Sequence, residues 1–107
     1  MFKNAFYTLK ADPQKGLCYK AKDTKEDISF SWPQFEICGK VSGTPTEFRE
    51  TGRRRLTDSI IEITGEGNLI CGAKLQIELR VSPYSPIIRF RYLLSAAAPL
   101  QRWLAND

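Results

Sequence analysis

Apolar and polar residues alternate with a period of two over much of the chain, and the clearest example is LQIELRV, residues 75–81. Its aliphatic positions are Leu75, Ile77, Leu79 and Val81. Successive side chains of an extended backbone point to opposite faces, so this spacing is typical of a strand with one buried face. The segment is therefore predicted to be a strand whose aliphatic side faces a core.

A second alternating segment follows SPYSP, residues 82–86. Pro83 and Pro86 cannot donate hydrogen bonds to a strand ladder, so the chain is expected to turn there. The next residues alternate again, with Arg89 and Arg91 on the polar side. The apolar side consists of Ile88, Phe90, Tyr92 and Leu94. The two segments are predicted to form an antiparallel hairpin.

Earlier parts of the chain repeat the pattern in shorter runs. Five further strand candidates are AFYTLK (5–10), GLCYKAK (16–22), ISFSW (28–32), FEI (35–37) and SIIEI (59–63). Their predicted core-facing residues include Ile28, Phe30, Trp32, Phe35, Ile37, Ile61 and Ile63. Turns are expected at DPQKG (12–16) and at Gly65 to Gly67. The chain is therefore predicted to be all-β, an antiparallel β-sandwich or meander of about five to seven short strands.

Two segments depart from this pattern. Residues 39–58 are mainly polar and predict either a long connection or a twisted edge hairpin. In the tail, Pro99 suits a first helical turn, and Leu100, Trp103 and Leu104 recur at helical spacing. A short C-terminal helix is accordingly expected over APLQRWLAND, residues 98–107.

The composition predicts a single domain over residues 1–107. Hydrophobic residues make up 42% of the chain and charged residues 26%, which is close to ordinary globular usage. A chain of 107 residues is long enough for one core. No segment approaches the roughly 20 apolar residues that cross a bilayer, so we expect no membrane association and a cytoplasmic location.

The cysteine and histidine content narrows the chemistry. Cys18, Cys38 and Cys71 are an odd set without C-x-x-C spacing, which indicates neither a zinc site nor a closed disulfide framework. Reduced, partly buried thiols are the preferred interpretation. The chain has no histidine, so it lacks the usual general base and the commonest metal ligand. We expect no cofactor and no metal site.

The motifs of common active sites are also absent from the sequence. There is no G-x-x-x-x-G-K-[ST] phosphate loop, and no serine lies in a nucleophile elbow. Carboxylates are plentiful, but the separation that a glycosidase needs between two of them does not follow from sequence spacing. The sequence therefore assigns no catalytic residue.

Two features are candidates for ligand binding. Arg53, Arg54 and Arg55 form the densest positive charge in a chain of net charge +4, and their guanidinium groups suit phosphates, carboxylates or sugar acids. The alternative is a solvated loop or an edge strand protected by its charge. Trp32 is suited to stacking on a sugar ring or a base, although the alternation favours its burial with the core residues.

The predicted hairpin, LQIELRVSPYSPIIRFRYLLS, resembles a stretch of the N-terminal β-sandwich domain of alpha-galactosidase-like enzymes of glycoside hydrolase family 36. In that family a strand ends in a short proline-containing turn, and the next strand begins with proline, two hydrophobic residues and arginine. The corresponding residues here are Ser82, Pro83, Tyr84 and Ser85, followed by Pro86, Ile87, Ile88 and Arg89. The segment SWPQFEICGK, residues 31–40, is similar to a further strand and turn of such domains.

This resemblance implies a non-catalytic domain of a carbohydrate-active enzyme that supports or caps a catalytic (β/α)8 barrel. The catalytic aspartates of the barrel would lie beyond Asp107, so no catalytic residue is transferred to this chain. Trp32 would correspond to an aromatic residue that some members contribute to the substrate pocket, which makes carbohydrate an expected ligand. The expected partner is a catalytic domain in the same chain or another protein.

Arg89 and Arg91 are predicted to face solvent or a neighbouring domain, because the apolar residues between them must occupy the core side. Arginine is favoured at interfaces, since its stem packs while its guanidinium binds carboxylates. We therefore expect both to be domain-interface residues. The alternative function is a free-standing binding module for nucleic acid or another polyanion, which would use the segment Arg53–Arg55.

Overall fold

The computed structural model describes residues 1–23, 26–95 and 102–103, and these residues form an all-β protein. They contain eleven strands in three antiparallel sheets, so the predicted fold class is confirmed. The strands are more numerous than expected because several have only two or three residues. No helix in the described part of the chain is long and apolar enough to cross a membrane.

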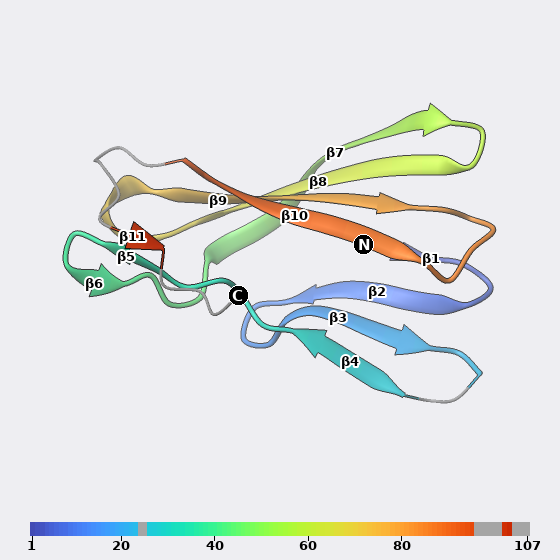
Figure 1. The fold of residues 1–107 in the computed structure, drawn as a ribbon, viewed down its shortest axis with the longest axis horizontal. Helices are drawn as coiled ribbons and strands as arrows, with labels where there is room; N and C mark the ends of the chain where they lie inside the picture. Colours follow the sequence, from blue (N-terminus) through green and yellow to red (C-terminus); the bar gives the residue numbers. More distant parts are fainter. Residues whose placement is uncertain (24–25, 96–101, 104–107) are drawn as a thin grey trace.

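Two four-stranded sheets lie on opposite sides of the molecule (Figure 1). The first has the order β1-β2-β3-β4, with β1 at Phe2–Lys3, β2 at Tyr7–Asp12, β3 at Gly16–Ala21 and β4 at Asp27–Phe30. The second has the order β10-β9-β8-β7, with β7 at Thr46–Thr57, β8 at Ile60–Asn68, β9 at Lys74–Val81 and β10 at Ile88–Ser95. Every pair of neighbours is antiparallel, which gives each sheet a meander topology.

A third, smaller sheet closes one end of the molecule (Figure 1). Its order is β11-β5-β6, with β5 at Phe35–Ile37, β6 at Lys40–Val41 and β11 at Arg102–Trp103. The helix expected in the tail is therefore wrong for Arg102 and Trp103, which pair with Glu36 and Phe35 as a strand. Residues 96–101 and 104–107 of that prediction lie outside the described residues. Backbone pairing with an exposed sheet edge has prevailed over helical spacing at these two positions.

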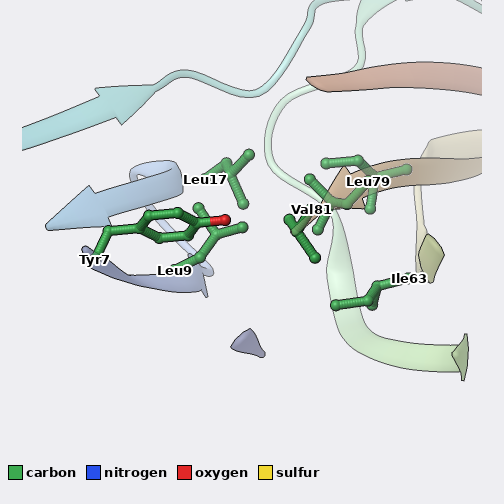
Figure 2. Packing of buried hydrophobic residues seen from close by; sticks show 7 residues of the cluster. Tyr7, Leu9, Leu17, Ile63, Leu79 and Val81 are labelled. Atoms are coloured by element: carbon green, nitrogen blue, oxygen red, sulfur yellow. The ribbon is translucent and has the colours of Figure 1, made fainter. Parts of the chain in front are cut away.

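The main core lies between the two larger sheets. Its fully or almost fully buried residues are Tyr7, Leu9, Leu17, Ile63, Ile77, Leu79 and Val81. Figure 2 shows residues of β2 and β3 on one side, opposite residues of β8 and β9 on the other. The aliphatic side of LQIELRV is thus buried, as its alternation predicts. Phe90 of β10 adds an edge-on contact with Phe30 of β4, with ring centroids 5.1 Å apart.

A second buried cluster lies next to the small sheet. It consists of Trp32, Phe35, Ile37, Ala73 and Leu75. The Trp32 ring is 4% exposed, and its centroid is 4.9 Å from that of Phe48. The cluster explains why β5 is buried although it has only three residues.

The glycine turn expected at Gly65 to Gly67 is wrong, because both glycines lie inside β8. The ring of Phe48 crosses over them from the neighbouring strand. A Cβ atom at Gly65 would lie 2.9 Å from this ring, and one at Gly67 would lie 2.9 Å from it and 2.8 Å from Pro45. The glycines therefore make room for Phe48 rather than reversing the chain.

Ile28 is also less buried than its alternation predicts. It lies on β4, the outermost strand of its sheet, and its side chain is 47% exposed. Phe30 of the same strand packs against the main core. The alternation therefore gives the correct face of the strand, but a position at the rim of the sheet leaves Ile28 in solvent.

The expectation of three reduced thiols is wrong, because Cys38 and Cys71 form a disulfide. Their Cα atoms are 6.6 Å apart, and 33 residues separate them in sequence. The bond joins the turn between β5 and β6 to the short 3-10 segment Ile70–Gly72 that precedes β9. Cys18 is the free cysteine among the described residues and is partly buried. Sequence spacing does not predict the pair, because it is the fold that brings the two loops together.

The disulfide is predicted to contribute about 3–4 kcal/mol to the free energy of unfolding, because it closes a loop of this length in the unfolded chain. The variant Cys38→Ser/Cys71→Ser should lose that amount in urea titrations. Cys18→Ser, which leaves the disulfide intact, is the matched control and should lose less than about 1 kcal/mol. An unchanged urea midpoint for the double variant, or three titratable thiols in the native protein, would contradict the assignment.

Two tyrosine hydroxyls lie in the interior without a hydrogen-bond partner among the described residues, those of Tyr7 and Tyr92. Figure 2 shows the Tyr7 hydroxyl surrounded by apolar side chains of the core. Burial raises the pKa of both hydroxyls to about 12, and for Tyr7 the neighbouring Tyr19 adds to the shift. Ionising either group in the folded protein would place an unpaired charge in the core.

Stability should therefore fall between about pH 10 and pH 12. The unfolded chain releases the two phenolic protons near pH 10, whereas the folded chain retains them to about pH 12. Each tyrosine should contribute about 2 kcal/mol to this loss. Urea titrations of Tyr7→Phe and Tyr92→Phe should show a smaller loss than the parent and no penalty at pH 8, since each variant removes an unpaired hydroxyl. Parallel pH profiles for parent and variants would rule out the buried hydroxyls as the cause.

Candidate functional site

The register of the second sheet places three arginines and one glutamate in a row across its outer face. Arg54 of β7 pairs with Glu62 of β8, Glu62 pairs with Arg80 of β9, and Arg80 pairs with Arg89 of β10. Residues that pair directly in antiparallel strands share a face. We call the outer-face group Arg54, Glu62, Glu78, Arg80, Arg89 and Arg91 the arginine face.

Glu62 is the anchor of this group. Its side chain is only 8% exposed, and its two carboxylate oxygens bind two different arginines. Arg54 Nε lies 3.0 Å from one oxygen, and Arg80 Nε lies 3.5 Å from the other. One buried carboxylate therefore faces two guanidinium groups and compensates only one of their two positive charges, and it fixes the guanidinium groups on both sides of β8.

In the neighbouring row of the arginine face, one positive charge faces one negative charge. Arg91 of β10 pairs directly with Glu78 of β9, and Arg91 Nε donates a hydrogen bond to Glu78 Oε1. This interaction lies at the surface, since the Arg91 side chain is 68% exposed. Arg91 therefore pairs with Glu78, the second carboxylate of the arginine face.

Further along the sheet, charges are also compensated. Gln76 and Lys74 donate hydrogen bonds to Glu66 and lower the pKa of its carboxyl group. The Lys74 ammonium lies 3.4 Å from Glu66 Oε1. On the arginine face, the positive charge that carboxylates do not compensate therefore lies at Arg80 and Arg89.

Arg89 differs from the other arginines of the face. It lies directly opposite Arg80, a residue of like charge, and within the described chain no carboxylate forms an ion pair with it. Like charges directly opposite each other in a sheet are destabilising. An anion between Arg80 and Arg89 would complete an alternation of charge along the row.

Two hollows flank the Arg80 and Arg89 side chains. The first, of about 230 Å³, is lined by Glu78, Arg80, Arg89, Phe90 and Arg91. The second, of about 270 Å³, is lined by Ile60, Arg80, Val81, Ser82, Ser85, Ile87 and Arg89. The two arginines thus separate a charged hollow from one whose walls include Ile60 and Ile87.

The turn between β9 and β10, which forms part of the second hollow, is fastened to the opposite sheet. Asn4 Nδ2 donates hydrogen bonds to the carbonyl oxygens of Ser82 and Ser85, at 2.7 and 3.0 Å. Tyr19 donates its hydroxyl hydrogen to the Pro86 carbonyl at 3.0 Å. Since Pro83 and Pro86 restrict the turn further, the start of β10 and its Arg89 are held in a defined position.

Arg53, Arg54 and Arg55 do not form one positive cluster. They lie in β7, an edge strand, and not in a loop, so consecutive side chains point to opposite faces. Arg54 belongs to the arginine face. Arg53 binds both oxygens of Glu50 and the Met1 carbonyl, while Arg55 is exposed. The edge-hairpin alternative for this region is confirmed, and three register irregularities and the arginines protect the edge.

Trp32 is not available as a stacking surface. Its ring is 4% exposed in the second cluster, and Nε1 donates a hydrogen bond to the Pro13 carbonyl at 3.2 Å. The fold does not support the suggested contact of Trp32 with a sugar or base, because the residue is 4% exposed and its ring contacts Phe48 and Tyr92. Its burial is the outcome that the alternation favours.

The outer face of the first sheet is a weaker candidate. It forms a shallow depression of about 590 Å³ with Lys10, Lys15, Lys20 and Lys22 on its walls, together with Asp12 and Asp27. Cys18 lies in it, 3.6 Å from the Ser29 hydroxyl. The lysines and the two carboxylates are interspersed, which is typical of a solvated face.

In the described part of the chain, His, Cys, Asp and Glu side chains form no group of three that could hold a metal. Comparison with known proteins gave no match to any family model, any curated protein or any solved structure. The assignment of the site therefore rests on the positions and charges of its residues.

Sequence reasoning identified part of this site and missed the rest. It singled out Arg54, Arg89 and Arg91, but assigned Arg54 to a loop ligand site and the other two to a domain interface. It missed Glu62 and Arg80 as their neighbours. The available signal was the alternation itself, which places both residues on the polar side of predicted strands. Which strands are neighbours, and in which register, was not available from it.

Proposed function

We propose that this chain is a non-catalytic β-sandwich domain that docks on a partner domain through the arginine face. The observation that supports the proposal is the arrangement of four arginines around two carboxylates on one sheet face, with Arg89 unpaired within the described chain. Arginine stems pack well in interfaces, and their guanidinium groups bind carboxylates in two-pronged geometry. An acidic partner surface complements such a face.

The resemblance of the hairpin to glycoside hydrolase family 36 suggests the identity of the partner. We propose that it is the catalytic barrel of an alpha-galactosidase-like enzyme, in the same chain or in a separate one. The residues of the resembling strand, Arg89 among them, form the edge of the arginine face. Contact with carbohydrate is assigned to the barrel, since Trp32 is buried.

Binding of nucleic acid or another polyanion through Arg53–Arg55 receives less support. The three side chains are divided between the two faces of an edge strand, and two of them already bind carboxylates. A polyanion binds most strongly to a continuous row of free cations. The fold does not place these three arginines in such a row.

The disulfide is relevant to the compartment in which the domain is located. Disulfides form and persist mainly in oxidising compartments, and Cys38 and Cys71 form one. We propose an oxidising compartment for this protein, in place of the cytoplasm expected from the sequence.

The proposal predicts that the native protein is several times larger than the 12.2 kDa of this chain, or is bound to such a protein. An antibody raised against residues 1–107 should detect it in source extract, on denaturing gels and on native gels. The purified chain should not hydrolyse an aryl alpha-galactoside, because the catalytic groups are assigned to the barrel. A native species of about 12 kDa, or turnover by the purified chain, would overturn the proposal.

A further inference from the structure

Arg89, which forms no ion pair within the described chain, and the hollow beside Ile60 and Ile87 together define a ligand with two parts. Arg80 and Arg89 line both hollows, so they lie at the boundary between the charged and the apolar surface. Ile60 and Ile87 in the second hollow are 38% and 65% exposed. A ligand that satisfies both halves needs one anionic group and one aliphatic group next to it.

The charge pattern favours a single carboxylate over a polyanion. Glu62 and Glu78 flank the arginine pair, and each already binds arginine. One anion between Arg80 and Arg89 is attracted by both guanidinium groups, but further anions would meet Glu62 in the same row or Glu78 in the neighbouring row. A chain of phosphates, which spaces its charges evenly, does not fit this alternation.

The position of the pair at a sheet edge favours an extended peptide. β10 is an outer strand of the described sheet, so a partner segment can reach the Arg80 and Arg89 side chains from this edge. Side chains of an extended segment alternate between two sides, so residues i and i+2 lie on the same side. Such a segment can present an acidic side chain to the arginines and, two residues away, an aliphatic side chain to the hollow.

We propose that Arg80 and Arg89 bind the side-chain carboxylate of an Asp or Glu in an extended segment of the partner protein, and that an aliphatic residue of the same segment fills the hollow beside Ile60 and Ile87. The inference rests on the proposed docking function and names the chemistry of its partner. Burial of the aliphatic residue supplies affinity, and the carboxylate relieves the repulsion between the two arginines.

The test uses the peptide acetyl-Ser-Leu-Ser-Glu-Ser-amide as the probe, in which Leu and Glu lie on the same side of an extended segment, with the 107-residue protein labelled with ¹⁵N. The Nε–H signals of Arg80 and Arg89 in the NMR spectrum should shift on titration, together with the backbone signals of Ile60 and Ile87. Arg89→Gln should weaken binding about tenfold, the value of a charge-assisted hydrogen bond. Ile87→Ser should weaken it about fivefold through lost apolar contact.

Two controls keep the result specific. Arg55→Gln removes the same charge from an exposed arginine outside the site, and it should leave the affinity unchanged within about twofold. The peptide acetyl-Ser-Leu-Ser-Gln-Ser-amide, which lacks the carboxylate, should bind at least tenfold more weakly. Amide spectra of all variants establish that each one is folded.

Three results would overturn the inference: equal binding of the neutral peptide, equal losses for Arg55→Gln and Arg89→Gln, or shifts confined to the lysines of the first sheet. Tight, salt-sensitive binding of a 20-nucleotide oligothymidylate at Arg80 and Arg89, without binding of the acidic peptide, would overturn it in favour of a nucleic-acid site. Failure of the peptide with a large native species on the gels would reject the ligand chemistry alone. A native species of about 12 kDa with peptide binding intact would reject the enzyme parent alone.

Discussion

The antiparallel register of β8, β9 and β10 is the constraint on which both the core and the arginine face depend. Ile63, Leu79 and Phe90 are paired across these strands and point toward the first sheet. The residues that precede or follow them, Glu62, Arg80 and Arg89, are paired in the same way and point outward. Because side chains alternate along a strand, a shift by one residue would bury the charges and expose the aliphatic residues. Burial of the core therefore also fixes the row of charges on the outside.

Two further devices hold the end of the sandwich at which the small sheet lies. Phe48 crosses Gly65 and Gly67 and contacts the Trp32 ring, so it joins the edge strand β7 to the second cluster. The disulfide ties the β5–β6 turn to the segment before β9. At the opposite end, Asn4 and Tyr19 fasten the β9–β10 turn to the first sheet. The sheet that presents the arginines is thus fixed at both ends.

The repulsion between arginines on the arginine face lowers the stability of the fold, and burial of the core offsets this loss. Arg80 and Arg89 lie opposite each other, and Glu62 neutralises Arg80 only in competition with Arg54. A sheet optimised for stability alone would place a carboxylate or a neutral residue at position 89. Departures of this kind from local optimisation are common at binding sites, where a partner supplies the missing interaction.

The sequence was sufficient for the fold class, for the β9–β10 hairpin and for the faces of its residues, because strict alternation in Leu75–Val81 and Ile88–Leu94 has one simple explanation. The sequence did not predict the features that depend on contacts between residues far apart in the chain. The glycines of β8 depend on Phe48, the disulfide depends on two loops that meet only in the fold, and β11 pairs with a strand more than 60 residues away. The arginine face was not predicted for the same reason, because the order of the strands and their register are set by tertiary structure.

The free energy of unfolding of Arg89→Gln, measured at low and at high salt, tests the central claim most directly. If Arg89 is an uncompensated charge opposite Arg80, the substitution should stabilise the free chain by about 0.5 kcal/mol at low ionic strength, and the gain should vanish near 1 M salt. If the substitution destabilises the chain at low salt, Arg89 already makes a favourable interaction within the fold. The arginine pair would then not be a site that awaits an anion.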